Sequence, residues 1–208
     1  MEFDDFFGSN NLPEILKKAK TLSKNECNSV FEYMRGKKEI TLFEFGTQKG
    51  CSAAVFLQIG KYFGIKMDLH SWDIKDLVQK SVVNKKDFTL HIEDITNRER
   101  VVFDKYRPNL VFLDAHPYEL TKNIVSICLE RKIDFMCHDV SLDIYERTKN
   151  RTCNLSDKSN GNGGTWELPI MGELISESLL THDSFENEKL IVNCVRDKYG
   201  LAIIKFKR

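Results

Sequence analysis

Residues 40–52, Ile-Thr-Leu-Phe-Glu-Phe-Gly-Thr-Gln-Lys-Gly-Cys-Ser, predict a buried strand that turns tightly into a helix. A short, mostly apolar run of this kind is typical of a strand that is covered on both faces of a parallel sheet. Gly46 permits the tight turn after the strand, and Gly50 permits a ligand or a helix to approach the backbone closely. The helix predicted over 52–63 would point its free N–H groups toward this turn.

Strands and helices alternate outward from this segment. Further strands are predicted at four places, 67–72, 88–92, 110–113 and 133–137. Helical patterns separate them, such as the one over 121–131, and this alternation indicates a parallel sheet with helices on both faces. Two apolar runs, 189–195 and 201–206, flank a turn and predict an antiparallel hairpin. The predicted fold class is α/β: a Rossmann-like, doubly wound, mostly parallel sheet with a C-terminal antiparallel hairpin.

The whole chain, residues 1–208, is predicted to form one domain, because about 200 residues suffice for one well-packed core. Its predicted parts are an N-terminal amphipathic helix (12–34), a core (39–140), a lid loop (141–165), and a C-terminal helix with the hairpin (166–208). The loop is rich in Asn, Ser and Gly, and loops of this length are usually functional lids or disordered segments. Both alternatives stay open.

Composition argues against several classes of partner. Lys plus Arg and Asp plus Glu number 31 each, so the formal net charge is zero and no nucleic-acid or membrane partner is indicated. No apolar run approaches the roughly 20 residues of a membrane helix, and the N-terminus lacks the pattern of a signal peptide. The six cysteines form no C-x-x-C pair, which favours free thiols in a reducing compartment. We therefore expect a cytoplasmic protein; the sequence does not indicate its oligomeric state.

Each predicted parallel strand is followed by a charged residue or a glycine. In open α/β sheets, ligands bind outside the carboxyl ends of the strands. The residues expected along this rim are Gly46, Asp73, Asp94, Asp114 and Asp139. The first turn is neither a phosphate-binding Walker loop, because Cys51 stands where lysine is needed, nor a G-x-G-x-x-G dinucleotide motif.

Asp73 ends the second predicted strand and has two possible roles. Its carboxylate can accept two hydrogen bonds from the hydroxyls of a ribose. Alternatively, it caps a helix that starts with Ile74. The glycine turn upstream favours the ribose role.

The order of these motifs resembles that of class I S-adenosylmethionine-dependent methyltransferases. It looks closest to the small-molecule O-methyltransferase branch that also contains cephalosporin hydroxylase-like proteins. The resemblance covers about residues 40–140 and rests on five motifs: Glu44-Phe-Gly-Thr-x-x-Gly-x-Ser52, Trp72-Asp73, Asp94-Ile95, Phe112-Leu-Asp-Ala-His-Pro-Tyr-Glu119 and Cys137-His-Asp139.

This resemblance implies an S-adenosylmethionine site along the rim. The residues implied for the methionine end of the cofactor are Glu44, Gly46, Thr47, Gly50 and Ser52. Asp73 would bind the ribose with Trp72 nearby, and Asp94 and Ile95 would flank the adenine. Asp114 would lie beneath the sulfonium and the substrate.

The resemblance also implies methyl transfer to a small molecule, at a hydroxyl whose proton a base or a metal helps to remove. The expected catalytic residues are His116, Asp114 and Asp139, with His116 as the base; alternatively, His116 is a surface histidine beside Pro117. A divalent metal is the other route, held by Asp114, His138 and Asp139. Magnesium prefers oxygen ligands, whereas a histidine suits manganese or zinc.

Two other classes of function remain. The chain could be a degenerate Rossmann-like module that holds a nucleoside ligand or a protein partner without catalysis. A nucleotide-dependent enzyme of another class is the third hypothesis, and the missing G-x-G-x-x-G motif argues against it. No Asn-Pro-Pro-Tyr-like motif follows the fourth strand, which argues against a nucleic-acid or protein methyltransferase. The acceptor pocket is expected to form mainly from the N-terminal helix and residues 141–170. In this segment, Trp166 and Glu167 either close over a substrate or start a helix that packs Trp166 on the core.

Overall fold

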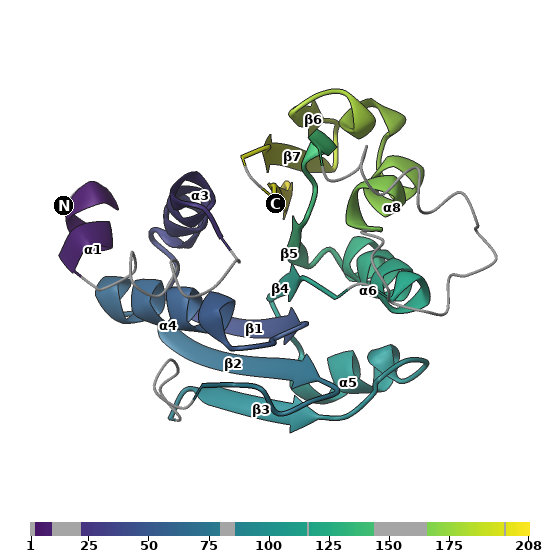
Figure 1. Cartoon of the computed structure of the whole chain (residues 1–208). Helices are drawn as coiled ribbons and strands as arrows, with labels where there is room; N and C mark the ends of the chain where they lie inside the picture. The colour runs from purple at the N-terminus through teal and green to yellow at the C-terminus, as the bar shows by residue number, and fades with distance from the viewer. Residues whose placement is uncertain (1–2, 10–21, 80–85, 116, 144–165, 198) are drawn as a thin grey trace. The chain divides into compact units, whose positions relative to one another are not determined.

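Six stretches of the chain are described by the computed structural model: 3–9, 22–79, 86–115, 117–143, 166–197 and 199–208. They belong to two compact units, Met1–Asp94 and Ile95–Arg208 (Figure 1). Most of the predicted lid loop, residues 144–165, lies outside these stretches. The prediction of one domain over 1–208 stays a prediction.

The first unit contains three parallel strands in the order β3-β2-β1. These are β1 (Glu39–Phe45), β2 (Lys66–Asp73) and β3 (Phe88–Ile92). Helix α4 (Cys51–Phe63) connects β1 to β2 and packs against β2, while α3 (Lys24–Met34) packs against α4 (Figure 1). A short helix, α1 (Phe3–Ser9), adds Phe6 to an aromatic cluster with Phe31 and Tyr62.

Helix α3 begins later than the predicted helix over 12–34. Ser23 caps it: the Ser23 hydroxyl accepts the N–H of Glu26 at 3.2 Å, and the Glu26 carboxylate accepts the N–H of Ser23 at 2.6 Å. This capping box satisfies two N–H groups that the first helical turn leaves without a partner. The predicted helix is wrong at Leu22 and Ser23 and is confirmed from Lys24 onward. Its first part, 12–21, lies outside the described residues.

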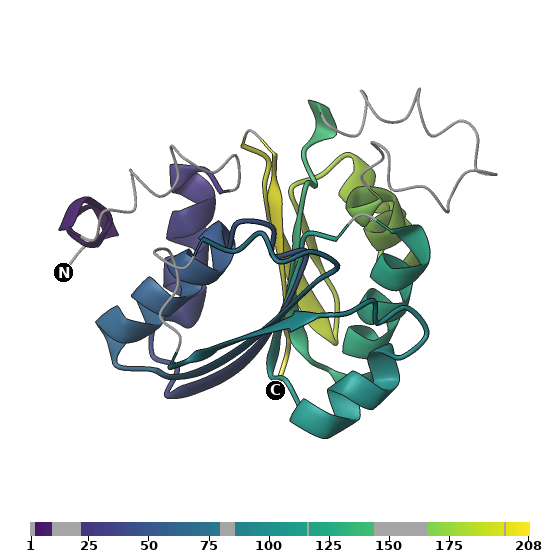
Figure 2. The same ribbon diagram turned by 60° about the horizontal axis from the view of Figure 1, so that its bottom comes forward.

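The second unit combines parallel and antiparallel strands in the order β4-β5-β8-β7-β6. Strand β4 (Leu110–Leu113) is parallel to β5 (Asp134–His138), and β8 (Leu201–Phe206) is antiparallel to both β5 and β7 (Leu190–Val195). A three-residue strand, β6 (Ser184–Glu186), pairs with β7. The other elements are α5 (Glu99–Tyr106), α6 (Tyr118–Arg131), α8 (Glu167–Leu174) and the 3-10 helix η2 (Glu177–Leu180). Figure 2 shows the three α-helices on one side of this unit's strands.

These strands confirm the predicted class: a mostly parallel α/β sheet with a C-terminal antiparallel hairpin. The third and fourth strands have the predicted bounds, and α6 starts three residues before the predicted helix. Helix α5 and strand β6 were not predicted. All five described cysteines are free thiols, as expected, and all five are buried. Among the described residues, no helix has both the length and the apolar character needed to cross a membrane.

Candidate functional site

The turn between β1 and α4 is closed by hydrogen bonds to the end of β2. Gly46 and Gly50 adopt φ angles of 91° and 77°, which glycine adopts at little cost. The N–H of Gly46 donates to the carbonyl of Trp72 at 3.0 Å, and the N–H of Gly50 donates to the carbonyl of Thr47 at 2.8 Å. The Thr47 hydroxyl also donates to the Trp72 carbonyl. The turn therefore fixes the N-terminus of α4 beside the carboxyl ends of β1 and β2.

Glu44 lies beneath this turn as a fully buried carboxylate. It accepts hydrogen bonds from the hydroxyls of Ser52, in the first turn of α4, and Ser71, in β2. A buried charge is stable only when such donors replace water. Glu44 therefore joins β1, β2 and α4, and the Ser52 hydroxyl, predicted to touch a cofactor, is used inside the protein.

Asp73 connects the turn to the end of β2. One carboxylate oxygen accepts the N–H of Gln48 at 2.8 Å, and the other accepts the N–H of Lys75 at 3.0 Å. Residues 74–79 form no helix, so the alternative that Asp73 caps a helix is wrong. Each carboxylate oxygen has two lone pairs, so both can also accept a ligand hydroxyl.

The other implied cofactor residues differ in exposure. The Trp72 ring is only 3% exposed and stacks on His91, with centroids 4.5 Å apart, and on Phe45 at 5.2 Å. Trp72 therefore contributes its carbonyl to the turn and its ring to the core. Asp94 is exposed just after β3, and Ile95, the first residue of the second unit, is buried.

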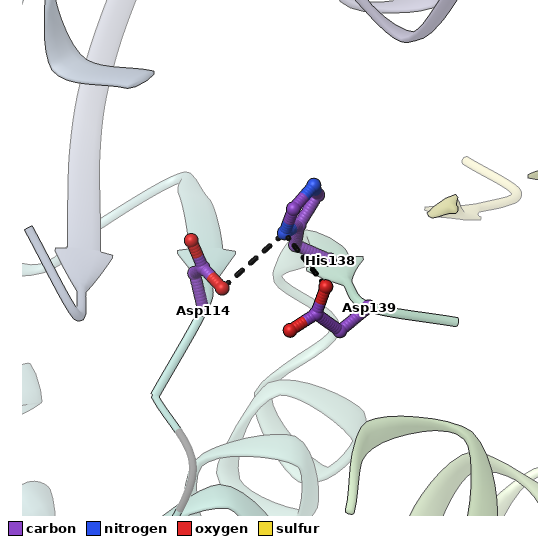
Figure 3. A group of neighbouring side chains, drawn as sticks. All are labelled: Asp114, His138 and Asp139. Carbon is purple, nitrogen blue, oxygen red and sulfur yellow. Dashed lines mark hydrogen bonds and ion pairs between the residues drawn. The ribbon is translucent and has the colours of Figure 1, made fainter. Parts of the chain in front are cut away.

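The second unit brings three predicted metal ligands together at the ends of β4 and β5 (Figure 3). His138 Nδ1 lies 3.2 Å from Asp114 Oδ1 and 3.4 Å from Asp139 Oδ1. One ligand atom from each residue lies within 4.8 Å of the other two. The imidazole and both carboxylates therefore converge on one point.

The backbone after β5 is held by the turn between β7 and β8. Asp139 has a φ of 59°, a left-handed conformation that aspartate tolerates better than most residues. The next residues are tied down, since the Val140 carbonyl accepts from Arg196 at 2.9 Å and the Ser141 N–H donates to the Tyr199 carbonyl at 2.8 Å. Gly200 packs so closely that an added Cβ would lie 2.4 Å from the Ser141 nitrogen.

The structure tests the predictions for Trp166 and Glu167 but not the one for His116. The predicted base, His116, lies outside the described residues, although α6 begins just beyond it at Tyr118. Trp166 precedes α8 and packs edge-on against the Tyr118 ring at 5.2 Å, and Glu167 is fully buried. This arrangement matches the alternative in which these residues start a helix.

Sequence reasoning missed three residues that support the site regions: Ser71 beneath the turn after β1, and Arg196 and Gly200 beside the residues that follow β5. Ser71 lies in a predicted strand, but nothing in its neighbourhood signals a bond to Glu44, 27 residues away. Gly200 was recognised only as a turn residue. Its glycine identity was the available signal, since a turn that packs on another backbone has no room for a side chain.

These features define a Rossmann-like α/β protein, and its fold is shared with solved methyltransferases. No protein-family model matches the sequence, and no curated protein matches it. Among solved structures, the methyltransferase PaMTH1 of Podospora anserina, bound to S-adenosylhomocysteine (SAH), matches 98% of this chain and 88% of its own, with a TM-score of 0.62 and 14% identity.

Two further structures share the fold. The O-methyltransferase from Bacillus cereus, also in complex with SAH, matches with a TM-score of 0.57 and 10% identity over 99% of this chain and 90% of its own. MycE, a methyltransferase of the mycinamycin biosynthetic pathway solved with Mg, SAH and mycinamycin VI, matches with a TM-score of 0.57 and 14% identity over 95% of this chain. This chain spans only 55% of MycE. These likenesses establish the fold.

Proposed function

We propose that this protein is an enzyme that transfers a methyl group from S-adenosylmethionine to a small-molecule acceptor, most simply at a hydroxyl. The observation that carries the proposal is the turn over 46–50, which is joined to Asp73 by the Gln48 N–H and fixes the start of α4. The helix N-terminus and the acid at the next strand end suit the methionine carboxylate and the ribose of that cofactor, and the glycine turn leaves room for it beside them. The fold, shared with SAH-bound methyltransferases, supports the same assignment.

The first unit would hold the cofactor. The N–H groups of the first turn of α4 have no partner within the helix, and the helix dipole there favours an anion, so they suit the carboxylate of the methionine end. Asp73 would accept the ribose hydroxyls, and Asp94 would accept the adenine amino group. Glu44 acts as a positioning residue because it is fully buried and holds Ser52 and Ser71.

Methyl transfer is a single displacement. The bond between the sulfonium sulfur and the methyl carbon breaks while a bond from the acceptor oxygen to that carbon forms, leaving SAH. The protein mainly aligns the three atoms, which contributes several kcal/mol. The hydroxyl proton must also leave, and we propose His116 as the base that takes it, with Asp114 and Asp139 as further catalytic residues.

The donors in the second unit fit a divalent metal. Two carboxylate oxygens and one imidazole nitrogen converge from Asp114, Asp139 and His138, and all three residues are at most slightly exposed. A bound divalent ion would act as a Lewis acid and make an acceptor hydroxyl easier to deprotonate. Without an ion, a proton on His138 Nδ1 would hold both carboxylates at this point; a bound ion would take the place of that proton. The roles of Ile95 beside the adenine and of Asp114 beneath the sulfonium remain predictions.

Asp73→Ala tests the cofactor assignment. We expect it to weaken S-adenosylmethionine binding at least tenfold, which corresponds to ~1.4 kcal/mol, because ribose loses its acceptor. Isothermal titration of purified wild-type and variant protein gives both dissociation constants. Asp76→Ala is the matched control, since Asp76 is an exposed acid in the same loop.

Equal affinity of Asp73→Ala and wild-type protein would contradict the ribose role of Asp73. The alternative of a binding module without catalysis predicts the same binding but no methylated product with any hydroxyl acceptor. No observation favours that alternative. A cytoplasmic location and the lack of nucleic-acid and membrane partners stay predictions from composition.

A further inference from the structure

We propose that His138 makes the site in the second unit select a borderline transition ion, such as Mn²⁺ or Zn²⁺, over Mg²⁺. This inference rests on the proposed function, because it names the metal class of the site formed by Asp114, His138 and Asp139. The proposed ion differs from the one in the MycE structure, which was solved with Mg. The argument depends on the distances, on how His138 is held and on the chemistry of its nitrogen.

The distances suit ligands that share one ion. Metal bonds to carboxylate oxygen and imidazole nitrogen are about 2.0–2.2 Å long, so neighbouring ligand atoms on one ion stand roughly 3–3.5 Å apart. His138 Nδ1 lies 3.2 Å from Asp114 Oδ1 and 3.4 Å from Asp139 Oδ1. All three ligand atoms lie within 4.8 Å of one another, so a shift of the carboxylate side chains would bring them onto one ion.

The imidazole is held in place, so it cannot easily give way to water. Its side chain is only 3% exposed, and its ring packs near Phe112 and Tyr199, with centroids 6.2 and 5.7 Å away. His138 is also the last residue of β5 and pairs with Leu201 of β8. The nitrogen that faces the two carboxylates is Nδ1 (Figure 3).

A fixed nitrogen ligand discriminates between ions. Mg²⁺ demands near-ideal octahedral oxygen coordination and keeps several waters, whereas Mn²⁺ and Zn²⁺ accept imidazole readily. Nδ1 binds an ion only through its lone pair, which places the ring proton on Nε2. A carboxylate in place of His138 would supply a third oxygen ligand and an additional negative charge, both of which favour Mg²⁺.

The test is a metal titration of the full-length protein after treatment with a chelator. MgCl₂, MnCl₂ and ZnCl₂ are titrated separately by calorimetry, with a competing chelator where binding is tight. We expect Mn²⁺ to bind at least about 100-fold more tightly than Mg²⁺, and Zn²⁺ more tightly still. His138→Asp should reduce the Mn²⁺ to Mg²⁺ ratio at least tenfold. His182→Ala, which removes an exposed histidine of the same unit, should leave the ratio unchanged.

Asp139→Asn provides a second variant in case His138→Asp does not fold. It keeps the histidine and should weaken Mn²⁺ binding at least tenfold. The visible spectrum of the Co²⁺-loaded protein gives a readout of nitrogen ligation that is independent of activity, and His138→Asp should change it.

Three results would overturn the proposal: Mg²⁺ binding as tight as Mn²⁺ binding, an unchanged ratio in folded His138→Asp, or no ion bound by protein that binds SAH. In the last case, Asp114 and Asp139 would simply accept the proton of His138 Nδ1. Failure of the proposed function looks different: folded protein would bind Mn²⁺ through His138 but neither S-adenosylmethionine nor SAH.

Discussion

Gly200→Ala is expected to lower the free energy of unfolding by about 3 kcal/mol or more. Gly200 has a φ of +88°, and an added Cβ would lie 2.4 Å from the Ser141 nitrogen and 2.8 Å from the Val140 carbonyl carbon. Because these atoms belong to the backbone, they cannot move aside as the end of a side chain can. Urea unfolding followed by circular dichroism measures the loss.

Gly64→Ala separates the steric effect from backbone strain. Gly64 has a φ of +65°, but nothing lies within 4 Å of an added Cβ. Gly64→Ala should therefore lower the free energy of unfolding only by the roughly 1–2 kcal/mol that alanine costs in a left-handed conformation. Equal losses in the two variants would contradict the close packing of Gly200 on Val140 and Ser141. Since those residues follow Asp139, Gly200→Ala should also weaken metal binding, whereas Gly64→Ala should not.

Glu44→Ala is expected to cost about 2–4 kcal/mol of unfolding free energy and to weaken cofactor binding. The substitution leaves a cavity and removes the acceptor of two buried hydroxyls, those of Ser52 and Ser71. Ser52 lies in the first turn of α4, so the helix N-terminus that we assign to the cofactor should also shift. Unfolding and S-adenosylmethionine titration are measured on the same preparation.

Glu39→Ala is the matched control, because Glu39 starts the same strand but is exposed, and its carboxylate pairs with the Lys66 ammonium at 2.6 Å. It should leave both the unfolding free energy and the cofactor affinity close to those of the wild-type protein. If Glu44→Ala behaved like Glu39→Ala, the buried carboxylate would not be what joins β1, β2 and α4.

Strongly patterned segments were predictable from the sequence. The strands over 88–92 and 110–113 have the predicted bounds: the first alternates apolar and polar residues, the second is an apolar run, and a charged residue closes each. Helix α5 was missed because it is only eight residues long and buries few apolar side chains, Val102 and Phe103, so its period is weak. Strand β6 has three residues, which is too short for any alternation to show.

Site residues at the ends of predicted strands were predictable from the sequence. The contacts that support them, between residues far apart in the chain, were not. Asp73 ends β2 in the first unit, and in the second unit Asp114 and Asp139 directly follow the parallel strands β4 and β5, which places these two residues at the same strand ends. The support of Asp139 depends instead on Arg196, which donates to a carbonyl 56 residues away. Neither spacing nor composition signals a bond of that kind.

A crystal structure of the protein with SAH tests the central claim most directly. We predict the ribose hydroxyls on the Asp73 carboxylate, the methionine carboxylate at the N–H groups that begin α4, and the turn over 46–50 against the ligand. SAH bound elsewhere on the chain, or crystals that stay free of it at saturating concentration, would contradict the assignment of this chain as a methyltransferase that uses this turn.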